Sequence, residues 1–246
     1  MVVGERGGPY WRRFRFGLYR IARPSVLALL RLTMGLRIEG LENVPQDGGA
    51  LVISNHLHNL DPIILVAVFP RPLQFMAKKE VFPVPVIGWI ARQAGAFPID
   101  RGAVDRAALR YAEGLLERGS LVGIFPEGTR STTGGIRESH AGSALVAVRS
   151  GAPIIPTAIF GTETLPLNGS KGRRHSPGRR PVTVRIGRPF QLPEHRATEP
   201  KPKLAEMTDH MMLEVAKLLP PEYRGIYAER VAPVAAEEEA APTPAS

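Results

Sequence analysis

A histidine and an aspartate stand five residues apart, directly after a short apolar segment, in the stretch 54–62. An aspartate that accepts the proton of one imidazole nitrogen leaves the other nitrogen free to act as a base. On one continuous helix, residues five apart point about 140° away from each other. We therefore expect His56 and Asp61 to meet only if the chain turns between them. A helix would then begin near Asp61, which Pro62 favours as a first helical residue.

Other chemistries for this stretch are weakened by what the sequence lacks. The chain has no cysteine, which excludes a cysteine nucleophile, a thiolate metal site and a disulfide scaffold. It has no Gly-x-Ser-x-Gly motif, which argues against a serine nucleophile. His56-Leu57-His58 resembles the opening of a dinuclear zinc pattern, but Leu60 stands where that pattern needs Asp, so we expect no metal. We expect His58 to line a pocket or to be structural. A His56–Asp61 pair that merely caps a turn fits the residues as well.

A second polar turn follows the apolar residues 121–124 and reads Phe125-Pro126-Glu127-Gly128-Thr129-Arg130-Ser131. The guanidinium of Arg130 can bind a phosphate through two hydrogen bonds, and Glu127 can hold either Arg130 or a ligand hydroxyl. Gly128 permits a close backbone approach or a positive φ. A surface turn with an ion pair explains these residues equally well.

The composition is that of a folded protein with an anionic partner. The chain has 246 residues, of which 43% are hydrophobic and 22% charged, and this balance excludes a wholly disordered protein. Its net charge is +9, which favours contact with anionic lipid, phosphorylated substrates or nucleic acid. One basic cluster lies in a Gly/Pro/Ser-rich stretch and consists of Lys171, Arg173, Arg174, Arg179 and Arg180.

The N-terminal segment is basic and rich in aromatic residues. Residues 1–37 contain eight arginines and one acid, and the longest apolar run there is the five residues 26–30. A signal peptide or a spanning helix needs a much longer apolar run, of about 20 residues for the helix. Aromatic and apolar residues between arginines are typical of a helix on a membrane surface. A helix packed on its own domain with a basic outer face fits the pattern too.

The rest of the chain alternates between short apolar runs and longer helical patterns, which predicts an α/β fold: a mixed, largely parallel sheet flanked by helices. The predicted strands are 36–39, 50–54, 73–77, 96–99, 121–125, 154–160 and 182–186. Helices are predicted over 103–118 and over 201–219, the second with Thr198 as its cap and Pro200 in its first turn.

Three parts of the chain are predicted from these patterns. Residues 1–34 form a helical membrane-association segment, residues 35–228 one α/β domain, and residues 229–246 a disordered tail. The tail is rich in Ala, Pro and Glu, and it has too little apolar surface to order itself.

Four blocks, taken together, resemble the signature of the glycerolipid acyltransferases, the family of lysophosphatidic acid and glycerol-3-phosphate acyltransferases. Asn55-His56 with Asp61 resembles the first block, 95–101 the second, 125–131 the third and 152–158 the fourth. Residues 75–80 also look like the lysine-bearing strand that these enzymes carry between the first two blocks. The resemblance covers residues 35–190.

This resemblance implies an O-acyltransferase that moves a fatty acyl group from acyl-CoA or acyl-carrier protein to the free hydroxyl of lysophosphatidic acid, giving phosphatidic acid. His56 would be the general base and Asp61 would orient it. No cofactor or metal is implied beyond the acyl donor. The residues that the likeness assigns to substrate binding are Asn55, Lys78, Arg101, Glu127, Gly128, Thr129, Arg130 and Pro156. We favour Lys78 over Lys79 because adjacent strand residues face opposite ways.

The resemblance also implies where the protein works and with what. Its lipid substrates lie in the bilayer, so we expect a peripheral or shallowly inserted protein on the cytoplasmic face of the membrane, without nucleic acid as a partner. Alternatives are another acceptor (glycerol 3-phosphate, another lysophospholipid or a lipid alcohol) or a non-catalytic lipid-binding relative. A nucleic-acid binder that uses the two arginine clusters is a third hypothesis.

Overall fold

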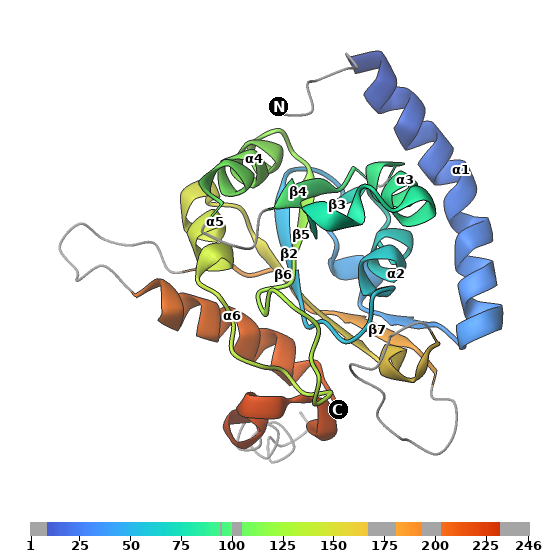
Figure 1. Ribbon diagram of the computed structural model, residues 1–246. Helices are drawn as coiled ribbons and strands as arrows, with labels where there is room; N and C mark the ends of the chain where they lie inside the picture. Colours follow the sequence, from blue (N-terminus) through green and yellow to red (C-terminus); the bar gives the residue numbers. More distant parts are fainter. Residues whose placement is uncertain (1–8, 94, 100–104, 167–180, 193–202, 232–246) are drawn as a thin grey trace, which may run out of the picture.

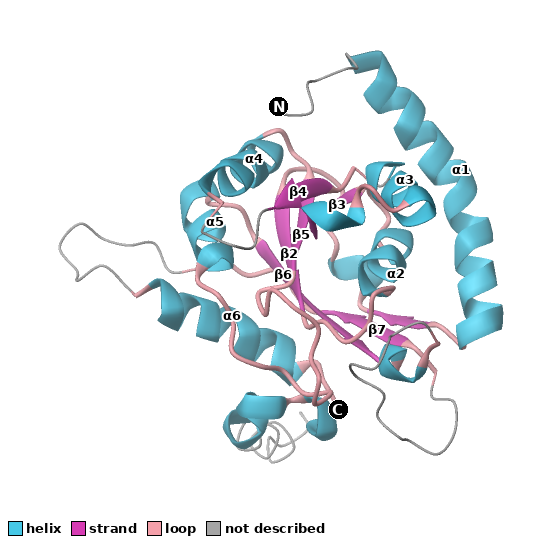
Figure 2. Ribbon diagram, viewed as in Figure 1, coloured by secondary structure: helices cyan, strands magenta, loops and turns pink. Residues whose placement is uncertain are grey.

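The computed structural model describes residues 9–93, 95–99, 105–166, 181–192 and 203–231. One β-sheet lies between two groups of helices (Figures 1 and 2). One face is covered by α4 (Arg106–Glu117), α5 (Gly142–Ser150) and α6 (Leu204–Lys217). On the other side lie α1 (Pro9–Met34), α2 (Asp61–Val68) and α3 (Pro85–Gln93).

The described part of the chain forms a sheet of seven strands in the order β1-β7-β6-β2-β5-β3-β4. They are β1 (Arg37–Glu39), β2 (Ala50–Ser54), β3 (Leu73–Lys78), β4 (Phe97–Ile99), β5 (Leu121–Ile124), β6 (Ile154–Phe160) and β7 (Thr183–Ile186). Neighbouring strands pair in parallel except β6 with β7, which are antiparallel. The predicted mixed, largely parallel sheet is therefore confirmed.

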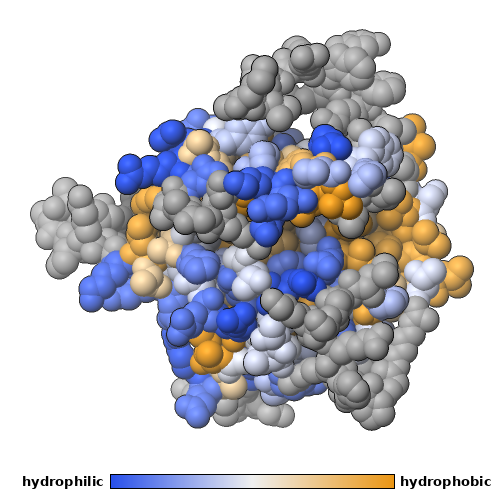
Figure 3. Space-filling model, viewed as in Figure 1, coloured by the Kyte–Doolittle hydropathy of each residue, from blue (hydrophilic) through white to orange (hydrophobic). Residues whose placement is uncertain are grey.

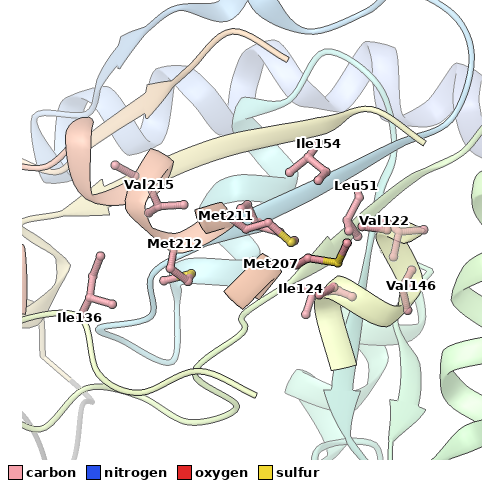
Figure 4. Packing of buried hydrophobic residues seen from close by; sticks show 14 of the residues in the cluster. Leu51, Val122, Ile124, Ile136, Val146, Ile154, Met207, Met211, Met212 and Val215 are labelled. Atoms are coloured by element: carbon pink, nitrogen blue, oxygen red, sulfur yellow. The ribbon is translucent and has the colours of Figure 1, made fainter. Parts of the chain in front are cut away.

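The central strand β2 is buried along its whole length, as expected for a strand that is covered on both faces. Leu51 and Ile53 point into the core beneath α4, α5 and α6, while Val52 points into the core on the α2 side. Met207 and Met211 of α6 pack into the first of these cores (Figure 4). Packing on both faces thus holds β2 in place, and with it the residues that follow its carboxyl end.

All seven predicted strands are present, with ends that differ by at most one residue. The helix predicted over 103–118 begins at Arg106, because Asp105 caps it by accepting hydrogen bonds from the amides of Ala107 and Ala108. The helix predicted over 201–219 begins at Leu204, and its predicted cap at Thr198 lies outside the described residues. Helices α3 and α5 were not predicted.

Helix α1 packs against the domain through one face and leaves the opposite face apolar and exposed. Arg23, Leu27, Leu30 and Met34 lie on the inner face, and the Arg23 guanidinium donates to the carbonyls of Ala67 and Val68, at 3.1 and 2.6 Å. Among the described side chains, the apolar ones that are most exposed on the outer face are Ile21, Leu29 and Leu32. Figure 3 shows apolar surface on this side of the molecule. None of the described helices combines the length and the apolar character that crossing a membrane requires.

The C-terminal residues 221–231 pack against the loop that follows the second motif. The amide of Ile136 donates to the Tyr223 carbonyl, and the amide of Ile226 donates to the Ile136 carbonyl. The disordered tail was predicted from residue 229, but residues 228–231 are helical and Val231 is buried in the core. That apolar contact orders the chain three residues further than the composition indicates. Residues 232–246 and the basic cluster at 171–180 lie outside the described residues.

Candidate active site

The two motifs meet because they follow neighbouring parallel strands. In the register of β2 and β5, Ile53 is opposite Ile124, so His56 and Glu127 each come three residues after a paired position. The carboxyl ends of parallel strands lie at one edge of a sheet, where α/β proteins bind ligands. The sheet therefore brings together two segments that are far apart in sequence.

His56 and Asp61 form a hydrogen-bonded pair at this edge. His56 Nδ1 lies 2.9 Å from Asp61 Oδ2, and the same oxygen accepts the amides of Leu57 and His58, each at 2.6 Å. The expected turn is present, and α2 begins at Asp61 itself. The Asp61 side chain is 0% exposed and that of His56 is 12% exposed.

Hydrogen bonds hold the Asp61 side chain in the turn. Its Oδ2 receives two amide donors in addition to the imidazole, and the positive end of the α2 dipole lies at Asp61. A carboxylate at this place holds the proton of His56 on Nδ1 and leaves a lone pair on Nε2. The arrangement can therefore present a base to a group outside the turn.

Glu127 ties the second motif to the first. Its Oε1 accepts the amide of His56 at 3.0 Å and its Oε2 accepts the amide of Arg137 at 3.1 Å. The side chain is 3% exposed, and this burial raises the pKa of Glu127 to about 7, against the effect of the two amide hydrogen bonds. Because the amide of Ser131 donates to the His56 carbonyl at 2.7 Å, the backbone of His56 is fixed on both sides.

Asn55 fixes the other flank of the same turn. Its side-chain nitrogen donates to the Ile159 carbonyl at 2.8 Å, and its oxygen accepts the Ile159 amide at 2.9 Å. Ile159 lies near the end of β6, so Asn55 joins the end of β2 to the neighbouring strand β6. Both polar atoms of the Asn55 side chain bond to the backbone, and the residue is buried.

His58 is a buried residue of the turn. Its Nδ1 accepts the amide of Leu60 at 3.0 Å, and the backbone of Leu165 and Pro166 lies close to the ring. Burial lowers the pKa of His58 against the opposing charge of Asp61, so the imidazole is neutral at pH 7. The expectation that His58 is structural or lines the site agrees with this position.

The loop of the second motif turns at Gly128 and carries Thr129 and Arg130 outward. Gly128 has φ +65°, and a Cβ there would lie 2.9 Å from the His140 ring. Thr129 is exposed and Arg130 half-buried. The charge of Arg130 lowers the pKa of His58, so the guanidinium is near enough to the first motif for its charge to act there.

Two other predicted site residues have contacts of their own, and a third lies outside the described residues. Lys78 ends β3 and is exposed, with its Nζ 3.6 Å from Glu80 Oε1. Pro156 is buried inside β6, opposite Ile53, rather than at the end of the strand. Arg101 lies outside the described residues.

An aromatic residue of the second motif was not predicted to belong to the site. The ring of Phe125 stacks on the His56 ring, with centroids 4.1 Å apart and planes inclined by 16°. The motif alone gives no signal for this contact, because Phe125 follows an apolar strand and could equally belong to the core.

Comparisons with known proteins identify the family. Residues 35–160 match the family model described as Acyltransferase. A 1-acyl-sn-glycerol-3-phosphate acyltransferase of Bacillus subtilis (strain 168) is 28% identical over 82% of this chain and 96% of its own length. The chloroplastic enzyme LPAT1 of Arabidopsis thaliana is 33% identical over 67% of this chain, but over 46% of its own, longer sequence.

A solved structure resembles this fold as well. The crystal structure of the 1-acyl-sn-glycerophosphate (LPA) acyltransferase PlsC from Thermotoga maritima superposes with a TM-score of 0.56 at 25% sequence identity. The superposition covers 91% of this chain and 83% of the Thermotoga maritima chain. The family model contains both motifs that meet at the carboxyl ends of β2 and β5. The chain therefore belongs to the acyltransferase family and is an O-acyltransferase.

Proposed function

We propose that this protein transfers a fatty acyl group from acyl-CoA or acyl-carrier protein to the free hydroxyl of lysophosphatidic acid, giving phosphatidic acid. The observation that carries the proposal is the His56–Asp61 pair, 2.9 Å apart, at the sheet edge where the Arg130 loop begins. Relatives that are named 1-acyl-sn-glycerol-3-phosphate acyltransferases support the choice of acceptor.

In the proposed reaction, His56 Nε2 removes the proton of the acceptor hydroxyl while Asp61 keeps the Nδ1 proton in place. The hydroxyl oxygen forms a bond to the thioester carbonyl carbon, the carbon–sulfur bond then breaks, and the thiolate takes the proton from His56. No covalent acyl-enzyme is formed. General-base help of this kind contributes about 10²–10⁴-fold, so the alignment of the two substrates supplies much of the remaining acceleration.

The acceptor phosphate is proposed to bind to Arg130, with Thr129 and the Gly128 backbone beside it. Arg101 and Lys78 are proposed to contribute at the same edge of the sheet, and Pro156 to affect the acyl donor from within β6. For Asn55 and Glu127 we propose a positioning role in place of the substrate contact predicted from sequence. Their polar atoms already hold the backbone at Ile159, His56 and Arg137.

Membrane association is proposed to occur through α1. The exposed Ile21, Leu29 and Leu32 would enter the boundary between headgroups and acyl chains, and the arginines of residues 1–37 would attract anionic lipid. A peripheral or shallowly inserted protein on the cytoplasmic face, where a lysophospholipid can reach the site, is part of this proposal. The proposed reaction needs no metal or other cofactor.

The proposal is tested with His56→Ala in the full chain. We expect thiol release from acyl-CoA with lysophosphatidic acid to fall at least a thousandfold, while pelleting with anionic liposomes stays unchanged. His210→Ala is the matched control, because His210 is an exposed residue of α6. Turnover by His56→Ala at the rate of the control would contradict the mechanism.

The acceptor is tested separately with a panel of lysophosphatidic acid, glycerol 3-phosphate, lysophosphatidylcholine and monoacylglycerol. We expect the highest kcat/KM with lysophosphatidic acid. A higher value with another acceptor would keep the chemistry and replace the substrate. No turnover with any acceptor, together with retained liposome binding, would favour the non-catalytic lipid-binding alternative.

A further inference from the structure

Three aromatic rings form a continuous stack that ends at the proposed base. His56 stacks on Phe125, with centroids 4.1 Å apart, and Phe125 stacks on Phe75, with centroids 4.9 Å apart. The planes of the two pairs are inclined by only 16° and 14°. The rings come from the turn after β2, the end of β5 and the middle of β3, so three adjacent parts of the sheet contribute to one column.

The sequence of β5 makes room for this column. Phe75 is paired with Gly123 in the register of β3 and β5, and a Cβ on Gly123 would lie 2.5 Å from the Phe75 ring. Glycine weakens a buried strand, because it adds no packing and loses more backbone entropy than other residues. The glycine at position 123 is explained by the Phe75 ring, which occupies the space that a side chain there would need. The stack therefore depends on a second, independent feature of the sequence.

Contact through the ring face has an electrostatic consequence for His56. The face of a phenyl ring carries negative potential and attracts a cation within about 6 Å of its centroid. The imidazole is neutral before it takes the acceptor proton and positively charged afterwards. An aromatic face parallel to it at 4.1 Å therefore stabilises the charged form more than the neutral one.

We propose that Phe125, backed by Phe75, is a positioning residue that fixes the plane of the His56 ring and stabilises the imidazolium formed during acyl transfer. This inference rests on the proposed function of His56 as the base. Phe125 makes or breaks no bond: the proton passes from the acceptor hydroxyl to Nε2, and the Nδ1 proton stays on the side of Asp61.

Other charged groups also act on this imidazole. Asp61 lies beside the Nδ1 atom of His56, and Glu127 accepts the backbone amide of His56. Arg137 in turn donates its amide to Glu127. Arg130 is near enough for its charge to act on His58 of the same turn. The stack differs from all of these because it acts on the ring face, and it can be removed without changing any charge or any hydrogen bond of the pair.

The test compares Phe125→Leu with Phe125→Tyr. The leucine keeps an apolar side chain but loses the ring face, so we expect kcat to fall about tenfold with both KM values changed less than twofold. The tyrosine keeps the face and should restore kcat to within twofold of the wild type. We also expect Phe125→Leu to move the acidic arm of the pH profile of kcat/KM to lower pH.

Phe190→Leu is the matched control. Phe190 also contacts a histidine, His210, but edge-on, with centroids 5.7 Å apart and outside the two motifs. We expect it to leave kcat and the pH profile unchanged. If Phe125→Leu does not fold, Phe75→Leu removes the second ring of the column and should lower kcat severalfold.

The outcomes separate this inference from the function on which it rests. Full activity of Phe125→Leu, or equal losses in the leucine and tyrosine variants, overturns the stacking role if His56→Ala is inactive. Should His56→Ala itself be active, the proposed base is wrong and the stacking role is overturned with it. Wild-type activity of Phe75→Leu overturns the role of the second ring.

Discussion

The amide of His56 donates a hydrogen bond to Oε1 of Glu127 across 71 positions of sequence. This bond links the base of the first motif to the carboxylate of the second. Because the other oxygen of Glu127 accepts the amide of Arg137, a single buried side chain joins three segments of the site. Changes at Glu127 should therefore affect both the fold and the reaction.

We expect Glu127→Gln to lower kcat and to destabilise the protein by about 1–3 kcal/mol, because the new NH₂ group would face a buried backbone amide. The measurements are initial rates and chemical denaturation at a series of pH values. Glu138→Gln is the control, since Glu138 is an exposed residue of the same loop. Equal stabilities and rates of the two variants would contradict this role for Glu127.

The pH dependence of that variant has a definite sign. Burial raises the pKa of Glu127 from its ordinary 4.5 to about 7. Between pH 4.5 and pH 7, the folded protein therefore binds more protons than the unfolded chain. This group therefore lowers the free energy of unfolding as pH rises through that window, by about 3 kcal/mol in all. We expect the cost of Glu127→Gln to be about 2–3 kcal/mol smaller at pH 8 than at pH 5. A cost independent of pH would contradict the raised pKa.

Asp61→Asn tests the charge of the pair rather than its shape. The amide group can accept hydrogen bonds at one atom only, and it offers His56 no negative charge. We expect kcat to fall about 10²–10⁴-fold, with a loss of stability because a neutral amide oxygen is a weaker acceptor than a carboxylate for the three donors that converge on Asp61 Oδ2. Thiol release and thermal unfolding measure the two effects. Activity near the wild-type value in a folded Asp61→Asn protein would mean that the carboxylate is not needed.

Arg130→Ala tests recognition of the phosphate. We expect KM for lysophosphatidic acid to rise about tenfold to a hundredfold, the range for a lost hydrogen bond to a charged group, with a smaller change for monoacylglycerol. Arg149→Ala is a suitable control, because Arg149 is an exposed residue of α5 paired with Glu113. An equal rise in KM for the acceptors with and without phosphate would contradict the proposed binding of the phosphate by Arg130.

Replacing Leu29 and Leu32 of α1 by serine tests the membrane surface. Burying one such side chain is worth about 1.5–3 kcal/mol, so we expect pelleting with anionic liposomes to fall at least tenfold. The control replaces Val148 and Ile226 by serine, two exposed apolar residues outside α1. If both double variants pellet like the wild type, α1 is not the membrane-binding surface.

The strands and the turn between His56 and Asp61 could be predicted because they depend on local patterns. Buried apolar runs such as 50–54 and 154–160 identify strands without knowledge of their neighbours, and Pro62 marks the start of the helix at Asp61. Helices α3 and α5 could not be predicted in the same way. The first begins at Pro85, directly after Pro83 and Val84, and the second begins at Gly142 without a side-chain hydrogen bond to its first amides.

The positioning residues could not be predicted because their partners are backbone groups far away in sequence. Asn55 bonds to Ile159, and Glu127 bonds to the amide of His56. A polar residue within a motif looks the same in sequence whether it binds a ligand or an amide of its own chain. The sequence around Phe125 likewise does not show that the ring of this residue faces an imidazole.

Helix α2 connects the reacting pair to α1 as a short rod. Asp61 stands at its first residue, and the carbonyls near its last residue are held by Arg23 of α1. Eight helical residues measure about 12 Å, so in the proposed docking through α1 the length of α2 would set the depth at which a lipid hydroxyl reaches His56. Lengthening or shortening α2 by one turn would shift that depth by about 5 Å and would select for acceptors whose hydroxyl lies higher or lower in the leaflet.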